Sequence, residues 1–396
     1  MSTEDAVYWD PYDPRFWNDP YPAYHRLREE APLYYNEKHD FYAATRFADV
    51  ERGLPDWQTF SSARGGILEL IKAGIEMPPG TLIFEDPTIH DVHRRLLARV
   101  FTPRRIAELE PRVRDFCVRT LDPLVGAGRF DLIATVGAEL PMRVIGMLLG
   151  IPEADQEAIR DTADESLRTE AGEQMDFKGG AVLSNELFRD YIEWRADNPS
   201  DDLMTDLLNA EFEDEDGTRR TLTHDEVLTY VTVVAGAGNE TTGRLIGWAG
   251  SLLAQHPDQR AELVADPSLI PGAIEEILRY EPPGPSIARY VTKDTELHGR
   301  TVPEGSSMLF IVAAANRDER QYPDPDRFDI HRKMSQQLTF GLGPHYCLGA
   351  ALARLEGRVA LEEILRRFPR WDVEWDGAKL AQTTTVRGWE SLPVFI

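Results

Sequence analysis

Residues 340–350 read FGLGPHYCLGA and present one cysteine, Cys347, between closely spaced glycines. Apolar residues at helical spacing follow it and meet no helix breaker before Pro369. The pattern therefore predicts that Cys347 lies at the N-terminus of a helix. Unpaired amides and the helix dipole favour an anion there, which predicts a thiolate. The alternative for a lone cysteine is a small buried hydrophobic side chain.

The residues around Cys347 favour contact with a flat, bulky group. Gly341, Gly343 and Gly349 allow turns and a close backbone approach that a side chain would block. Phe340 is placed to pack beside the sulfur and exclude water. The segment is thus typical of a ligand-binding loop, although it does not identify the ligand.

The composition is that of an ordinary globular protein. The chain has 396 residues, of which 42% are hydrophobic and 28% charged, and it shows no linker, repeat or low-complexity tract. We therefore expect one domain spanning residues 1–396. The net charge of −25 argues against binding to nucleic acid or to anionic membranes.

The sequence predicts a cytoplasmic protein without a membrane anchor. The first residues are acidic and aromatic rather than basic and then apolar, and no apolar run is long enough for a membrane span. Two cysteines form no disulfide framework. Cys117 falls in a helical pattern, where a buried structural role is expected.

Periodicity predicts a mainly α class with minor β sheets. Residues 1–60 mix short helix with alternating segments, and residues 90–280 are helical almost throughout. Strand patterns return near residues 288–316 and in the C-terminal tail.

One predicted helix stands out by its length. It starts with a capping box at Thr223 and Glu226 and continues without proline to Gln255. Gly236, Gly238 and Gly243 weaken its middle by about 1 kcal/mol each relative to alanine. Such glycines indicate room for a ligand or a local kink.

The same weak point carries Glu240, Thr241 and Thr242. A carboxyl group beside hydroxyls suggests proton delivery. A polar face of an exposed helix is the alternative, but the flanking segments are too apolar for a solvated face.

Together these features resemble the cytochrome P450 family. The family's cysteine loop is matched by Phe340, Gly341, Gly343, His345, Cys347 and Gly349. Its long distal helix is matched by the run AGNET at residues 237–241, with glutamate as the less usual acid. The resemblance covers nearly the whole chain and implies a haem between the long helix and the cysteine-bearing proximal helix.

The resemblance implies haem b as cofactor, with Cys347 as the metal ligand that donates electron density to the iron. Buried propionates need charged or hydrogen-bonding donors. The residues matching the family's propionate ligands are His90, Arg94, Arg289 and His345. Ala237 would lie against the haem, whereas His93 and Arg95 are expected to point away to solvent or a partner.

The resemblance also implies roles away from the haem. Glu276, Arg279 and Arg327 would form a buried structural triad. Glu240 and Thr241 would be catalytic, delivering protons to oxygen. The expected substrate pocket, suited to a steroid, terpenoid or fatty acid, consists of Ile67, Leu68, Leu82, Ile83, Phe84, Val233, Val234, Ser286, Ile287, Thr385 and Val386.

The expected activity is insertion of one atom of O2 into a C–H bond of a hydrophobic small molecule. Electrons would come from a ferredoxin and a ferredoxin reductase. Residues 90–119 contain eight arginines against four acids, and we expect part of this segment, with Arg354 and Arg358, to dock an acidic ferredoxin. A peroxide-driven peroxygenase and a haem-based sensor are the alternatives; a zinc or nucleophilic-cysteine enzyme is disfavoured because no second ligand or base lies at suitable spacing.

Overall fold

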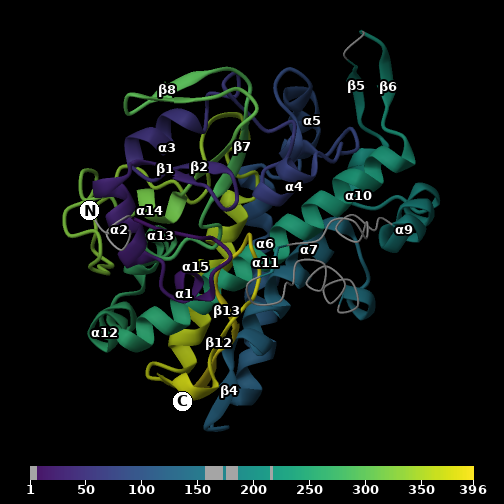
Figure 1. Ribbon diagram of the computed structural model, residues 1–396. Helices are drawn as coiled ribbons and strands as arrows, with labels where there is room; N and C mark the ends of the chain where they lie inside the picture. Colours follow the sequence, from purple (N-terminus) through teal and green to yellow (C-terminus); the bar gives the residue numbers. More distant parts are fainter. Residues whose placement is uncertain (1–6, 157–172, 175–185, 215–216) are drawn as a thin grey trace.

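The computed structural model describes residues 7–156, 173–174, 186–214 and 217–396 (Figure 1). Its α-helices are α1 Pro14–Asn18, α2 Tyr21–Glu30, α3 Phe47–Gly53, α4 Leu68–Ala73, α5 Ile89–Ala98, α6 Pro103–Leu121, α7 Glu139–Leu149, α9 Glu186–Asp197, α10 Leu203–Leu208, α11 His224–Gln255, α12 Pro257–Ala265, α13 Ile270–Tyr280, α14 Val312–Ala315 and α15 Ala350–Arg367. Its strands are β1 Leu33–Asn36, β2 Phe41–Ala44, β3 Phe60–Ser61, β4 Arg129–Asp131, β5 Glu211–Glu213, β6 Arg219–Thr221, β7 Ile287–Val291, β8 Thr295–Leu297, β9 Arg300–Val302, β10 Ser307–Phe310, β11 Asp372–Val373, β12 Lys379–Leu380, β13 Trp389–Ser391 and β14 Pro393–Phe395. The predicted class, mainly α with small sheets, is confirmed.

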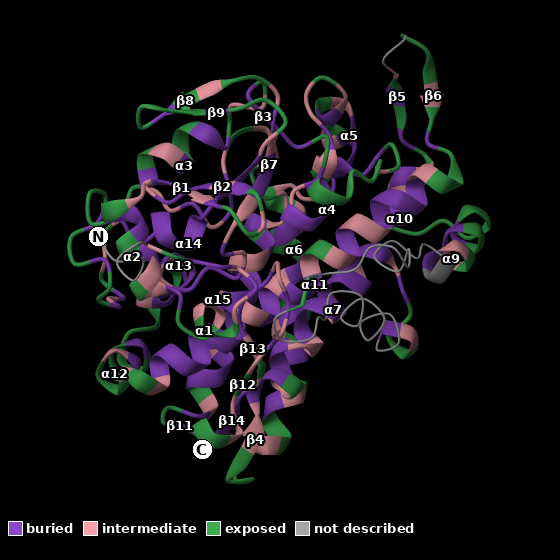
Figure 2. Ribbon diagram, in the orientation of Figure 1, coloured by how far each residue is buried: buried purple, intermediate pink, exposed green. Residues whose placement is uncertain are grey.

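Helix α11 runs diagonally through the middle of the molecule and packs against α7, α9, α13 and α15 (Figures 1 and 2). The Thr223 side chain accepts from the Glu226 amide, and the Glu226 carboxylate accepts from the Thr223 amide, which completes the predicted capping box. The helix continues to Gln255, as the sequence predicts. Most of its side chains are buried, so packing rather than helix propensity stabilises it.

The glycines of α11 mainly admit neighbouring protein segments. A Cβ on Gly243 would lie 2.5 Å from the carbonyl oxygen of Gly137, in the short helix η3 (Ile133–Gly137). A Cβ on Gly236, in contrast, would have no atom within 4 Å. The expectation that these glycines make room for a ligand therefore fails for Gly243, where the neighbour is backbone, and remains for Gly236.

A five-stranded sheet with the order β1-β2-β10-β7-β3 lies on one side of the helical region (Figure 1). Strand β10 pairs parallel with β2 and antiparallel with β7. This register places Arg289 of β7 opposite Met308, in the interior of the sheet rather than at its edge.

Helix α15 packs closely against α6 and carries the end of the chain towards the small C-terminal strands. Its N-cap is Gly349, two residues after Cys347. The prediction that Cys347 precedes a helix is confirmed. Cys117 of α6 is fully buried, which confirms its expected place in the core.

In the part of the chain that the structure describes, no helix combines the length and the apolar character that a membrane crossing requires.

Candidate active site

The cysteine loop, residues 340–349, is held by its own backbone. The Cys347 amide donates to the Phe340 carbonyl over 2.8 Å, which closes the loop. Gly341 and Gly343 both have φ of 68°, a left-handed conformation that favours glycine. A Cβ on Gly343 would also stand 2.7 Å from Pro55. The glycines therefore shape the loop as the sequence predicts.

Burial raises the pKa of the Cys347 thiol above its ordinary value, while the Gly349 amide, Arg94 and Arg354 lower it to a smaller extent. The residue nevertheless keeps solvent access on one side. Desolvation therefore disfavours the anionic sulfur more than the Gly349 amide and the two arginines favour it. A bound metal ion would favour the thiolate further.

Basic side chains gather beside the cysteine loop. The rings of His90 and His345 lie 4.4 Å apart, and the Nε2 atoms of both are buried without a hydrogen-bond partner among the described residues. Arg289 is 4% exposed, and the one side-chain hydrogen bond recorded for it goes to the Ala288 carbonyl over 2.8 Å. The structure thus brings together three of the four predicted propionate ligands.

Burial dominates the pKa values of this cluster, although the Asp91 carboxylate lies 3.2 Å from His90 Nδ1. Burial lowers the pKa of Arg289 to about 10 and that of His345 to about 3, and it also lowers the pKa of His90. Buried donors of this kind normally face an anion. The donor set therefore fits the two carboxylates of a haem placed beside Cys347.

Arg94 lies at the cysteine loop, where its Nη2 donates to the Tyr346 carbonyl over 2.6 Å. Both Arg94 and His90 are on α5, four residues apart, as the sequence predicts. Arg94 is therefore the fourth basic side chain at the edge of the site.

One stripe of α11 remains open although the helix is otherwise buried. Val233, Ala237 and Thr241 are four residues apart and so share one helix face; Ala237 is exposed, and the other two are half-buried. Gly236, which meets open space, borders the same stripe. This stripe is the part of α11 that a flat ligand can approach.

The predicted proton-delivery residues point to different neighbours. The Thr241 hydroxyl donates to the Ala237 carbonyl over 3.1 Å. Glu240 is buried, and its carboxylate accepts from Arg244 Nη2 over 2.6 Å. The longer glutamate side chain thus reaches one turn along the helix to Arg244.

The predicted structural triad is correct for two of its three members. Glu276 and Arg279 form a fully buried, bidentate pair with both distances at 2.7 Å. Arg327 is wrong: its side chain is 68% exposed and pairs with Asp329. The third arginine is Arg332, whose Nε donates to Glu276 over 3.1 Å, because the chain turns after Arg327 and brings Arg332 inward.

The predicted pocket residues separate by burial. Leu68, Leu82 and Val234 are buried in core clusters. Val386 is buried and Ile83 is exposed. The half-buried residues, which remain candidates to touch a substrate, are Ile67, Phe84, Val233, Ser286, Ile287 and Thr385.

The loop that carries Thr385 and Val386 is anchored by an arginine that the sequence did not single out. Arg387 is buried; its guanidinium contacts Glu281 and donates to the carbonyls of Trp17 and Asn18. No sequence motif signals this role, because Arg387 lies near the C-terminus whereas Trp17 and Asn18 lie near the N-terminus.

His93 differs from its prediction. It is 5% exposed, and its Nδ1 lies 2.7 Å from the Glu85 carboxylate, so it does not point to solvent. The partner precedes His93 on another segment, and sequence spacing gave no sign of it. Arg95 is exposed, as predicted.

The basic segment near α6 is less basic in three dimensions than its sequence indicates. Arg114 and Arg358 share Glu110 and Glu362, Arg104 pairs with Glu108, and Arg354 pairs with Glu275. Glu362, Glu363 and Asp206 lie outside residues 90–119 and pair with arginines of that segment, so they reduce the surplus that the count gives. Arg95, Arg99 and Arg112 are exposed and have no ion pair among the described residues.

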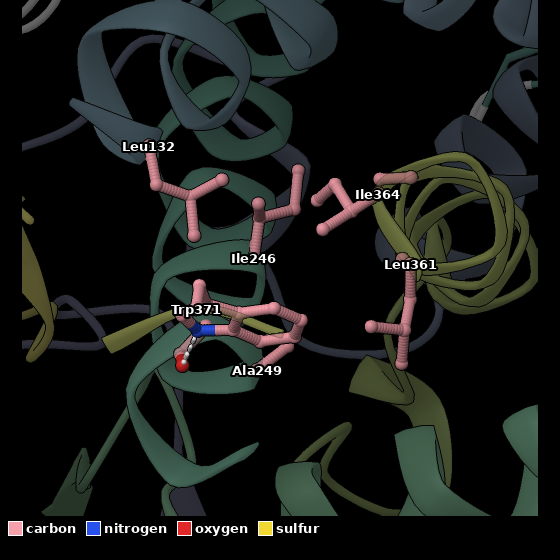
Figure 3. A pocket seen from close by; sticks show the side chains of 9 residues that line it. Leu132, Ile246, Ala249, Leu361, Ile364 and Trp371 are labelled. Carbon is pink, nitrogen blue, oxygen red and sulfur yellow. Dashed lines mark hydrogen bonds between the residues drawn. The ribbon is translucent and has the colours of Figure 1, made fainter. Parts of the chain in front are cut away.

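A small apolar cavity of about 10 Å³ lies between α11 and α15 and is separate from the predicted pocket (Figure 3). Ile246, Leu361 and Trp371 line it, and the Trp371 indole donates to the Gly250 carbonyl over 2.9 Å. None of the predicted substrate residues belongs to its lining.

A mainly helical fold with an accessible cysteine before a helix, buried basic donors and an open stripe on a long helix defines a haem-thiolate protein. The family model described as Cytochrome P450 matches residues 181–385. This chain therefore belongs to the cytochrome P450 family, and it is a monooxygenase with haem as cofactor.

Curated relatives and solved structures support the same assignment. The putative cytochrome P450 123 of Mycobacterium tuberculosis is 40% identical over 393 residues, covering 98% of this chain and 96% of the relative. The vitamin D(3) 25-hydroxylase of Pseudonocardia autotrophica is 35% identical over 400 residues, covering 100% and 98%. A structure of a P450 EryK mutant in complex with erythromycin B has a TM-score of 0.87 and 34% identity, covering 96% of each chain.

Proposed function

We propose that this monooxygenase hydroxylates a C–H bond of a large hydrophobic molecule, such as a steroid, terpenoid or fatty acid, as one domain spanning residues 1–396. The observation that carries the proposal is the basic set of buried His90 and Arg289 with half-buried His345, whose Nε2 atom is buried, beside an accessible Cys347. This set fits a haem, and the half-buried residues around it are mainly apolar. The relatives named for vitamin D(3) and erythromycin support a bulky substrate.

In this proposal Cys347 holds the haem, which supplies the iron at which O2 is activated. His90, Arg94, Arg289 and His345 neutralise and orient the propionates. Val233 and Ala237 give the substrate an apolar surface that excludes water.

Thr241 and Glu240 supply the proton path. The Thr241 hydroxyl lies on the open stripe and exchanges its bond to the Ala237 carbonyl for one to the reacting oxygen. Glu240 lies on the neighbouring face, where Arg244 orients its carboxylate, and it passes protons from solvent towards Thr241.

Replacement of Thr241 by alanine tests this path. We expect reducing equivalents to be diverted to hydrogen peroxide, with product per NADH reduced about tenfold or more, in the range of a general acid–base contribution. Thr242→Ala is the matched control, because Thr242 is buried on another face of the same turn. An equal yield of product per NADH in Thr241→Ala and the parent enzyme would show that Thr241 does not take part in proton delivery.

The substrate class is tested by titrating the ferric enzyme with a library of steroids, macrolides, terpenoids and fatty acids and recording the shift of the haem band. Compounds that shift the band are then supplied with a ferredoxin, its reductase and NADH. Product formation supports the proposal. Binding without turnover would favour a haem-based sensor, and equal turnover with hydrogen peroxide alone would favour a peroxygenase.

We propose a separate ferredoxin and its reductase as the electron source. The unpaired arginines Arg95, Arg99 and Arg112 lie on α5, its C-terminal end and α6, on elements next to the cysteine loop or packed against α15. They leave three positive charges without an ion pair among the described residues, in a chain of net charge −25. Such charges suit an acidic partner.

A further inference from the structure

A buried contact between a carboxylate and a histidine joins the segment before α5 to α5 itself. Glu85 and His93 are 9% and 5% exposed, and the Glu85 Oε2 atom lies 2.7 Å from His93 Nδ1. The other carboxylate oxygen accepts from the Gly80 amide over 2.7 Å. Glu85 therefore closes the segment from residue 80 to residue 85 and attaches it to α5.

The closed segment carries the short helix η1 (Leu82–Phe84), which packs between α5 and α11. The Phe84 ring comes within 3.2 Å of the point where a Cβ on Gly66 would stand, and Arg289 Nη1 lies 3.9 Å from the same point. Phe84 thus reaches the neighbourhood of the basic set. At its other end, a Cβ on Gly80 would lie 3.8 Å from Thr229 and Tyr230 of α11, so the segment extends from the basic set to this helix.

The pair also contacts α11 and the cysteine loop. The His93 ring packs edge-on against Tyr230 of α11, with centroids 5.8 Å apart and an interplanar angle of 81°. The main chain of Glu85 lies beside the His345 ring, where it opposes the lowering of that residue's pKa. The pair of Glu85 and His93 therefore connects residues 80–85, α5, α11 and the cysteine loop.

Stability alone is a poor reason for this arrangement. Apolar residues of similar volume can replace a buried ion pair without loss of stability, because they avoid the cost of desolvation. What apolar residues cannot reproduce is directed bonding to the Gly80 amide and to His93. The bonds fix where Phe84 stands relative to α5, which carries His90 and Arg94.

We propose that Glu85 and His93 are positioning residues that hold Phe84 over the substrate side of the haem and thereby set the shape of ligand that the site accepts. This inference rests on the proposed active site. Neither residue touches the reacting atoms. The pair acts through the segment that it closes.

The test compares two azole probes of different size on the haem-loaded enzyme. In Glu85→Met with His93→Leu, we expect the Kd of 4-phenylimidazole, measured by titration of the haem band, to rise by about tenfold or more. The Kd of imidazole, which is too small to reach Phe84, should stay within about twofold. Unchanged Kd values for both probes in this folded variant would overturn the inference.

Two further variants keep the test decisive. Asp49→Leu with His298→Leu removes another histidine–carboxylate pair of 2.7 Å, remote from the site on α3 and the β8–β9 turn, and should change neither Kd. If the first variant does not fold, His93→Leu is compared with His93→Gln, whose amide retains a donor for Glu85. Weaker 4-phenylimidazole binding in His93→Leu, restored in His93→Gln, supports the inference, and equal binding in the two contradicts it.

The failure of the inference is distinguishable from failure of the proposed site. If the unaltered protein gave no imidazole shift of a haem band, the proposed site itself would be wrong. If the unaltered protein gives that shift but the Kd values of the two probes do not change when Glu85 and His93 are replaced, the proposed site is retained and the positioning role is rejected.

Discussion

The cysteine loop and the segment at residues 80–93 border the same site but are held in different ways. The cysteine loop is fixed by local backbone features, namely two glycines at positive φ and the bond from the Cys347 amide to the Phe340 carbonyl. Residues 80–93 depend on side chains, above all the pair of Glu85 and His93. The part that holds the cofactor is therefore specified within ten residues, and the part that faces the substrate is specified by contacts between separate elements.

The difference separates chemistry from selectivity. A loop determined by its backbone tolerates little variation, which suits a metal ligand whose position must not change. A segment closed by side chains can be altered one pair at a time. We expect substitutions in the first region to abolish function and those in the second to redirect it.

The largest expected effect comes from breaking the cysteine loop at its metal ligand. Cys347→Ala should abolish the red-shifted Soret band that a haem-thiolate protein shows as its ferrous carbon monoxide complex, because no thiolate remains to bind iron. Cys117→Ala, which changes a fully buried cysteine away from the loop, should keep the band. A retained band in Cys347→Ala would show that the wrong ligand had been assigned.

The next effect concerns Arg289, which lies between the two regions. Arg289→Leu removes a buried donor for a propionate and should weaken haem retention by about 2–5 kcal/mol, or roughly 30-fold to several thousandfold in dissociation. The haem-free protein should instead gain about 1 kcal/mol or more of unfolding free energy, because a buried charge with little compensation is removed.

These opposite signs are checked by haem transfer to apomyoglobin and by urea unfolding of the haem-free protein. Arg219→Leu, which replaces an exposed arginine on β6 without an ion pair among the described residues, is the control and should change neither quantity. A lower free energy of unfolding for haem-free Arg289→Leu, together with normal haem retention, would contradict the assignment.

A smaller effect, which depends on pH, is expected on the free energy of unfolding through Glu356 of α15. Burial raises the pKa of Glu356 from 4.5 to about 8. Between these values the folded protein holds a proton that the unfolded chain has released, so stability is present at low pH and lost as pH rises through about 8. The upper limit is about 5 kcal/mol, at about 1.4 kcal/mol per pH unit.

Glu356→Gln should therefore gain unfolding free energy relative to the parent protein as pH rises from 5 to 8, with no further gain above that. Denaturant unfolding at several pH values measures it. Glu362→Gln, on the same helix but with its carboxylate in surface ion pairs, should show no such trend. A difference between Glu356→Gln and the parent that does not vary with pH would show that Glu356 is ionised in the folded state.

The smallest effect concerns docking of the electron donor. Arg99→Glu reverses an exposed arginine without an ion pair among the described residues and should raise the Kd for an acidic ferredoxin several-fold at low salt. Arg104→Glu should change it less, because Glu108 already offsets that charge. Surface plasmon resonance at two salt concentrations measures both. A larger effect of Arg104→Glu would show that ion pairing on α6 does not govern docking.

Local sequence predicts the elements that local interactions determine. The limits of α11 and the N-terminus of α15 were predictable, because capping boxes, glycines and periodicity act over a few residues. The strands β4, β5 and β6 were missed, because they are only three residues long and interrupt a region, residues 90–280, whose pattern is otherwise helical. The roles of Cys347 and of the pair of Glu276 and Arg279 came from the family resemblance, because local spacing alone equally allowed a buried structural cysteine and a surface ion pair.

The predictions that failed depend on contacts that cross the chain. Arg332 replaces Arg327 because a turn decides which arginine faces Glu276. His93 is buried because Glu85 meets it from another segment. Arg114 of α6 is offset by Glu362 and Glu363 of α15, which a count over residues 90–119 does not include. Spacing within one segment contains no information about such partners.

The bonds from Arg387 to Trp17 and Asn18 have a practical consequence for handling this enzyme. The loop that presents Thr385 is tied to the first helix, and the Trp17 indole also donates to the Ala381 carbonyl over 2.9 Å. A purification tag or fusion joined close to residue 14 is therefore attached to a segment that contacts the loop carrying Thr385, on the substrate side of the site. Assays that compare substrates need a version whose tag has been removed, or one with the tag at the other end.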